Sequence, residues 1–172
     1  MGKKILVIDD SALMRRVISD IINSDDEYEV AAIAKDGLEG FDLIVSNPDL
    51  YSAVILDINM PKMNGLELLE KLQKNKIQQT VIIVSTVAKE GARETIRALE
   101  LGAFDFVTKP ENYLETKGEV FKNRIREMLD VATSAKEPMT ASLSAGSFRT
   151  PDRTVRRTSS SASPGTPVSS RT

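Results

Sequence analysis

The sequence predicts an α/β protein with a doubly wound parallel sheet, built from five successive strand–helix pairs, (βα)5. Short aliphatic runs alternate with amphipathic stretches from residue 4 to residue 132, and the links between them are short. Alternation of this kind is typical of a parallel sheet covered by helices on both faces. The clearest run, residues 53–56, contains β-branched Val54 and Ile55 and no polar residue, which favours a strand buried on both faces.

The first half of the chain holds two strands and two helices. The first strand is expected over residues 4–8, and either Asp10 or Ser11 can cap the helix that follows. The second strand covers residues 28–34, and residues 36–39 resemble a capping box with Asp in place of Ser or Thr. Apolar side chains at helical spacing are expected to face the core: Leu13, Val17 and Ile21 in the first helix, and Leu38, Phe41 and Val45 in the second.

The second half continues the alternation. The third strand ends at Asp57, and Pro61 and the Asn64-Gly65 pair then force a turn. Strands follow at residues 80–84 and 104–108. The helices are predicted at residues 92–101 and 113–132, after one that begins near residue 65. Their expected core-facing residues are Leu66, Leu69 and Leu72, then Ala92, Ile96 and Leu99, then Val120, Phe121, Ile125, Met128 and Leu129.

Composition divides the chain into a globular part, residues 1–132, and a segment of different character, residues 133–172. Of the last 35 residues, 15 are Ser or Thr and four are Pro. So few apolar side chains cannot offset the entropy of ordering, so we expect a disordered linker or tail rich in Ser, Thr, Pro and Arg. Residues 133–172 carry a charge of +4, which leaves −6 for the globular part of a chain whose net charge is −2. An acidic body predicts no binding to nucleic acid.

The residue types that are missing exclude several kinds of chemistry. The chain has no cysteine and no histidine, which rules out disulfides, thiolate or imidazole metal ligands and a Ser-His-Asp triad made by this chain alone. The apolar run near the N-terminus is too short for a signal peptide, and no run approaches membrane-spanning length. We therefore expect a cytoplasmic protein without a membrane partner.

Polar side chains follow four of the predicted strands. Asp9 and Asp10 follow the first, Asp57 the third, Ser85 the fourth and Lys109 the fifth. The carboxyl ends of strands in a doubly wound sheet converge on one crevice. Crowded carboxylates repel one another, and a divalent cation with oxygen ligands, Mg²⁺ above all, relieves that repulsion. A carboxylate beside Mg²⁺ and a lysine is a suitable nucleophile toward phosphorus.

The motifs Asp9-Asp10, Asp57-Ile58-Asn59-Met60-Pro61, Ser85 and Lys109-Pro110 resemble the receiver domain of two-component response regulators, over about residues 3–132. The resemblance implies the strand order 2-1-3-4-5 and a Mg²⁺ cofactor held by Asp9, Asp10, Asp57 and the backbone carbonyl of Asn59. It also implies that Asp57 accepts phosphate from a histidine kinase. The remaining implied roles are Lys109 as the phosphoryl contact, Ser85 as the switch hydroxyl and Phe106 as the switch aromatic.

A narrower likeness concerns residues 10–15, 84–91 and 98–110, which are similar to the receiver of the chemotaxis protein-glutamate methylesterase. It implies regulation of an output, either a methylesterase domain absent from this chain or, for a stand-alone receiver, a separate partner. That partner would dock on the face formed by the helix at residues 92–101, the fifth strand and the last helix.

Two other classes fit less well. A phosphatase of the haloacid dehalogenase type places an Asp acid/base two residues after its Asp nucleophile, whereas this chain has Asn59 there, which cannot exchange a proton in that role. A flavin carrier of the same topology needs a phosphate-binding loop after the first strand, where Asp9 and Asp10 would repel the phosphate. The expected catalysis is therefore limited to the chain's own phosphorylation and dephosphorylation.

Overall fold

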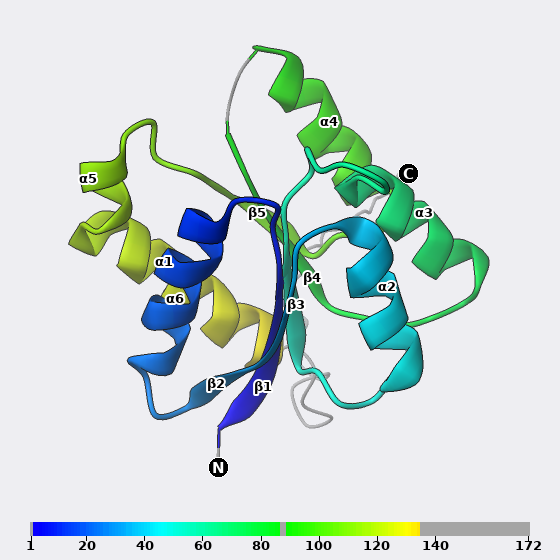
Figure 1. Cartoon of the computed structure of the whole chain (residues 1–172), viewed down its shortest axis with the longest axis horizontal. Helices are drawn as coiled ribbons and strands as arrows, with labels where there is room; N and C mark the ends of the chain where they lie inside the picture. The colour runs from blue at the N-terminus through cyan, green and yellow to red at the C-terminus, as the bar shows by residue number, and fades with distance from the viewer. Residues whose placement is uncertain (1, 87–88, 135–172) are drawn as a thin grey trace, which may run out of the picture. The chain divides into compact units, whose positions relative to one another are not determined.

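A computed structural model describes residues 2–86 and 89–134, and it contains a parallel sheet of the order β2-β1-β3-β4-β5. Strands and helices alternate along the chain (Figure 1). The predicted fold class and strand order are both confirmed. The elements are β1 (Lys3–Ile8), α1 (Ala12–Asn23), β2 (Tyr28–Ala34), α2 (Gly37–Ser46), β3 (Ala53–Leu56), α3 (Gly65–Lys74), β4 (Val81–Ser85), α4 (Lys89–Glu100), β5 (Asp105–Thr108), α5 (Tyr113–Thr116) and α6 (Glu119–Ser134).

Successive side chains of the inner strands point to opposite faces of the sheet, and each face has its own apolar core. In β1, Ile5 and Val7 pack with α1 and α6, whereas Leu6 and Ile8 pack with α2, α3 and α4. Figure 1 shows these two groups of helices on either side of the sheet. All four residues of β3 are buried, as the unbroken apolar run predicts.

Side chains cap the helices that start near the carboxyl ends of the strands. Ser11, rather than Asp10, caps α1, since its side chain accepts from the Met14 amide. Asp36 caps α2 through the Glu39 amide, but Glu39 accepts from the Lys35 amide, so the predicted capping box is only half formed. A complete capping box joins Asn64 and Glu67 at the start of α3.

The single helix predicted over residues 113–132 is wrong, because the structure has two helices there. The first, α5, ends after one turn, where the Thr116 hydroxyl donates to the Tyr113 carbonyl. The Gly118 amide then bonds back to the Glu115 carbonyl, and the chain starts again as α6 at Glu119. A threonine hydroxyl that competes for a backbone carbonyl and a glycine two residues later both favour such a break.

Several apolar residues expected in the core are exposed instead. Ile96 on α4 is 59% exposed and Val120 on α6 is 79% exposed. Gly40 and Ile44 face the core from α2, and Ala98 does so from α4. An apolar stripe at helical spacing gives two or three candidate faces, and the packing of the sheet selects among them. The other predicted core residues found exposed are Leu13, Leu38, Val45, Ala92 and Leu99.

The amino ends of β1 and β2 are joined to α6 by polar contacts. The buried Tyr28 hydroxyl bonds to the Asp130 carboxylate, and burial and this carboxylate raise the pKa of Tyr28. Lys3 Nζ donates to the Thr133 hydroxyl at 3.2 Å, and Arg126 Nη2 donates to Asp25 Oδ2 at 3.1 Å. These contacts lie at the opposite end of the strands from the predicted crevice. In the described residues, no helix has the length and apolar character needed to cross a membrane.

Candidate functional site

Three carboxylates meet at the carboxyl ends of β1 and β3. These strands are neighbours with Ile8 opposite Leu56, and the Asp57 amide donates to the Ile8 carbonyl at 2.9 Å. Asp9 and Asp57 therefore leave the sheet at the same level, and Asp10 follows directly. One carboxylate oxygen from each of the three lies within 4.8 Å of the others. The structure thus brings together the acidic residues that the strand order predicts.

Lys109 reaches this cluster from the end of β5. Its amide donates to the Ser85 carbonyl at 2.8 Å, which anchors the backbone after β5 against the end of β4. Its Nζ lies 2.9 Å from Asp9 Oδ2 and 3.3 Å from Asp57 Oδ1. Only 11% of the lysine side chain is exposed, so these ion pairs are little screened by solvent. One ammonium group here faces two buried carboxyl groups.

The environment of Asp57 disfavours its charged form. Burial is the main cause, and the Asp9 charge adds to it, while Lys109 acts in the opposite direction. Together they raise the pKa of Asp57 to about 7. A carboxyl group whose pKa is raised by burial and by a neighbouring carboxylate is a candidate for a functional site.

The oxygen atoms of the cluster fit a small, hard cation. Asp9 Oδ1 accepts from the Ser11 amide at 2.9 Å, whereas Asp9 Oδ2 is buried without an aligned hydrogen-bond donor. Lys109 Nζ is close to that oxygen but is not oriented to donate to it. The exposed Asp10 carboxylate has no hydrogen bond or ion pair within the described residues. Carboxylate oxygens that lack an aligned hydrogen-bond donor are suitable ligands for a divalent ion.

The other predicted site residues lie around the same edge of the sheet. Asn59 is exposed in the link between β3 and α3, two residues after Asp57. Ser85 is buried as the last residue of β4, opposite Thr108 of β5. Phe106 is half-buried and packs against the core that lies under α2, α3 and α4. Asn59 and Ser85 lie close to the ends of β3 and β4, whereas Phe106 lies within β5, opposite Ile83 of β4. The roles of all three stay predictions.

Two residues that support the site were not predicted. Arg15 of α1 donates from Nη1 to the Asp9 carbonyl at 2.7 Å. Gly65, at the start of α3, passes so close to β3 that an added Cβ would lie 2.5 Å from the Asp57 carbonyl oxygen. The sequence shows how far Arg15 and Arg16 are from the Asp pair. Sequence spacing does not indicate which of the two arginine side chains contacts Asp9.

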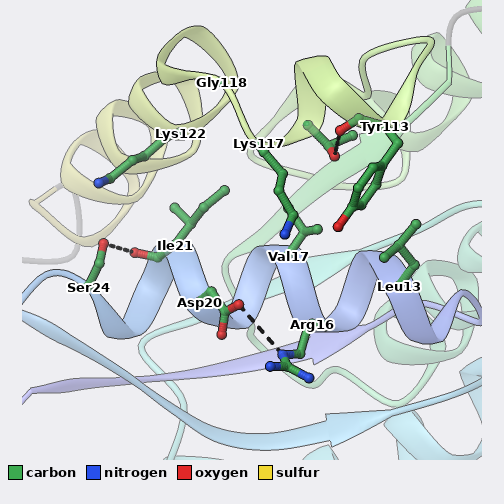
Figure 2. A pocket seen from close by; sticks show the side chains of 11 residues that line it. Leu13, Arg16, Val17, Asp20, Ile21, Ser24, Tyr113, Lys117, Gly118 and Lys122 are labelled. Carbon is green, nitrogen blue, oxygen red and sulfur yellow. Dashed lines mark hydrogen bonds and ion pairs between the residues drawn. The ribbon is translucent and has the colours of Figure 1, made fainter.

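A separate groove lies between α1 and the pair α5 and α6, with a volume of about 460 Å³. Figure 2 shows Leu13, Val17 and Tyr113 in it, with Lys117 and Lys122 on the side of α5 and α6. Its lining residues include neither Lys109 nor any of the three carboxylates Asp9, Asp10 and Asp57. The groove is therefore distinct from the candidate site.

The chain is similar in sequence and fold to known proteins. The response regulator receiver domain family matches residues 5–119. The crystal structure of the response regulator domain of Thermotoga maritima CheB is 38% identical with a TM-score of 0.65, and the match covers 78% of this chain and 96% of that one. A CheX-CheY-BeF3-Mg²⁺ complex from Borrelia burgdorferi is 25% identical with a TM-score of 0.60, covering 73% of this chain and 89% of that one.

Curated relatives agree with these structures. The protein-glutamate methylesterase/protein-glutamine glutaminase of Pyrococcus horikoshii is 43% identical over 141 residues, which are 80% of this chain and 37% of the relative. The Escherichia coli protein of the same name is 40% identical over 143 residues, again 80% of this chain and 40% of the relative. The chain thus spans well under half the length of these relatives. With its five-stranded sheet, its carboxylate cluster and these matches, the chain belongs to the response regulator receiver domain family.

Proposed function

We propose that this receiver accepts a phosphoryl group on Asp57 from the phosphohistidine of a histidine kinase. The observation that carries the proposal is the position of Lys109 Nζ, 3.3 Å from Asp57 Oδ1 and 2.9 Å from Asp9 Oδ2. An Asp57 oxygen attacks phosphorus, the P–N bond breaks, and its electron pair stays on the imidazole, which takes up a proton. Lys109 then stabilises the negative charge that spreads over the phosphoryl oxygens.

Mg²⁺ is the ion that we propose for the cluster, with Asp9, Asp10, Asp57 and the backbone carbonyl of Asn59 as its protein ligands. When bound, it supplies positive charge that neutralises the transferring phosphoryl group. Two observations support this assignment: Asp9 Oδ2 is ion-paired with Lys109 but has no aligned hydrogen-bond donor, and the Asp10 carboxylate has no partner within the described residues. The structural neighbour from Borrelia burgdorferi, a complex with BeF3 and Mg²⁺, supports it as well.

The raised pKa of Asp57 bears on the reaction directly. With a pKa of about 7, Asp57 is partly protonated near neutral pH when no metal is present. A protonated carboxyl group is a poor nucleophile, so the residues that hold positive charge near Asp57 also activate it. We expect phosphorylation in the presence of Mg²⁺ to continue to lower pH than the metal-free pKa would allow.

We further propose that phosphorylation is read on the face formed by α4, β5 and α6. Ser85 would move toward the phosphoryl group and Phe106 would turn inward beside β4. Exposed apolar side chains on two of these elements support the proposal, since Ile96 on α4 is 59% exposed and Val120 on α6 is 79% exposed. The occupant would be a methylesterase domain, as the names of the relatives suggest, or a separate partner of a stand-alone receiver.

We assign residues 1–132 to the receiver domain and residues 133–172 to a linker or tail. The tail lies almost entirely outside the described residues. The residues proposed for phosphoryl transfer lie at the strand ends, so the reaction does not require the tail. A shortened chain that ends at residue 135 should take up phosphate at the same rate as the full chain.

The test is intact-mass spectrometry after incubation with acetyl phosphate and MgCl2. We expect one acid-labile phosphate in the wild type, none in Asp57→Asn, and a slower reaction in Lys109→Met. Asp20→Asn serves as the matched control, since Asp20 is an exposed carboxylate on α1. Stoichiometric labelling of Asp57→Asn would refute the assignment, and steady turnover of p-nitrophenyl phosphate would favour a phosphatase instead.

A further inference from the structure

Arg15 contacts the backbone of the acidic turn rather than its carboxylates. Its Nη1 donates to the Asp9 carbonyl at 2.7 Å, while its own amide closes the first turn of α1 on the Ser11 carbonyl. The side chain is half-buried. It forms no ion pair among the described residues, although Asp9 and Asp10 are close along the chain. The Arg15 guanidinium therefore binds a peptide oxygen.

That oxygen belongs to the peptide group that joins Asp9 to Asp10. A hydrogen bond to the carbonyl oxygen restrains the orientation of this planar peptide group, and so restrains the direction in which the Asp10 side chain leaves the backbone. Asp9 has other restraints, since its carboxylate contacts the Ser11 amide and Lys109. Asp10 has no side-chain hydrogen bond or ion pair within the described residues, so the direction of its backbone is the restraint that remains on the choice of side-chain rotamer.

We infer that Arg15 is a positioning residue for the metal-binding carboxylates. It holds the peptide between Asp9 and Asp10 so that the Asp10 carboxylate faces Asp9 and Asp57, all within 4.8 Å. The inference rests on the proposed Mg²⁺ site, and Arg15 itself touches neither the metal nor the phosphoryl group. Partners that hydrogen-bond to metal-ligating side chains commonly change metal affinity by about 10-fold to 100-fold when they are removed, and we expect the lower end of that range for a contact made through the backbone.

The sign of the effect separates this role from simple electrostatics. A guanidinium near a cation site repels the cation, so an Arg15 that acted only through its charge would weaken Mg²⁺ binding, and its removal would strengthen it. An Arg15 that orients Asp10 has the opposite effect, since its removal leaves Asp10 free to turn to solvent. The two roles thus predict changes in the Mg²⁺ dissociation constant that differ in direction.

Arg16 is the matched control. It is the next residue, has the same charge, and has a side chain that is 81% exposed. Figure 2 shows it on α1 among the residues that line the groove, with Asp20, to which its Nε lies at 3.6 Å. A change that follows from the charge of α1 as a whole should appear equally in Arg16 variants.

The experiment is calorimetric titration of the full chain with MgCl2, without phosphodonor, on wild type, Arg15→Ala, Arg15→Met, Arg15→Lys and Arg16→Ala. We expect the dissociation constant to rise by at least about 10-fold in Arg15→Ala and Arg15→Met. Arg15→Lys keeps a donor and should lie between these variants and wild type, and Arg16→Ala should stay within about 2-fold of wild type, as expected of an exposed site. Thermal melts confirm that each variant is folded.

An unchanged or tighter dissociation constant in Arg15→Ala would overturn the inference, as would an equal loss in Arg16→Ala. Failure of the proposed function gives a different result, since a wild type that binds no Mg²⁺ fails before any variant is compared. A wild type that binds Mg²⁺ but takes up no phosphate leaves the role of Arg15 standing. A second readout is the amide resonance of Ser11, which should shift in Arg15→Ala because Ser11 donates to Asp9 Oδ1 in the same turn.

Discussion

Replacing Asp57 by Asn should stabilise the metal-free protein at neutral and alkaline pH. Asp57 is 5% exposed and shares Lys109 with Asp9, and these surroundings raise its pKa from 3.8 to about 7. Each pKa unit corresponds to about 1.4 kcal/mol, so the ionised side chain costs the folded state about 4 kcal/mol above pH 7. Asparagine keeps the size of the side chain and removes the charge.

The same shift sets how stability changes with pH. The unfolded chain loses the Asp57 proton near its ordinary pKa of 3.8, whereas the folded chain keeps it until about 7. Between these values the folded state binds more protons, so the free energy of unfolding falls as the pH rises. From pH 5 to pH 8 the wild type should lose about 2 to 3 kcal/mol through this residue. Asp57→Asn should lack that part of the pH dependence.

The assay is urea denaturation followed by circular dichroism in EDTA, at several pH values between 5 and 8. The difference between Asp57→Asn and wild type should grow with pH and reach several kcal/mol at pH 8, and added Mg²⁺ should reduce it by stabilising the wild type. Asp20→Asn, at an exposed carboxylate, should match wild type within about 0.5 kcal/mol. Parallel pH curves for wild type and Asp57→Asn would show that Asp57 is not the destabilising group.

Two further substitutions test the packing on which the site depends. Tyr28→Phe removes the hydroxyl that bonds Asp130 and should lower the free energy of unfolding by about 1 to 2 kcal/mol. Tyr113→Phe, at a half-exposed ring, is the control and should leave the free energy of unfolding unchanged. Equal losses for the two variants in urea denaturation would contradict the Tyr28 contact. Gly65→Ala places a Cβ 2.5 Å from the Asp57 carbonyl oxygen, so it should lower the free energy of unfolding by about 1 to 3 kcal/mol and slow phosphorylation. An Ala variant with wild-type stability and rate would show that α3 does not pack closely against this strand end.

The fold could be predicted from the sequence because its strands are short and aliphatic. The run at β3 is buried along its whole length, and Asp57 stands where the run ends. The strand order came from the motif resemblance, since hydrophobic periodicity does not say which strands are neighbours. The convergence of Asp9, Asp10 and Asp57 then follows from the geometry of parallel strands.

Helix faces and long side chains were harder to predict. Val120 and Ile96 have the spacing of core residues, but the sheet presents its apolar surface to other faces of α6 and α4. The sequence does not say which carboxylate Lys109 pairs with. In the folded chain its Nζ lies 2.9 Å from Asp9 Oδ2 and 3.3 Å from Asp57 Oδ1. The contact of Arg15 with a carbonyl depends on its rotamer, which leaves no mark in sequence spacing.

The contacts at the amino ends of β1 and β2 also bear on the order of folding. The bonds of Lys3, Tyr28 and Asp25 to α6 join residues that are 130, 102 and 101 positions apart in sequence. Closing loops of this length costs entropy that local contacts do not, so these bonds should form late. Until α6 docks, the apolar face of β1 that carries Ile5 and Val7 lacks the cover that Phe121, Ile125 and Leu129 provide. A chain still being synthesised therefore passes through a stage in which this face is open to aggregation or to a chaperone.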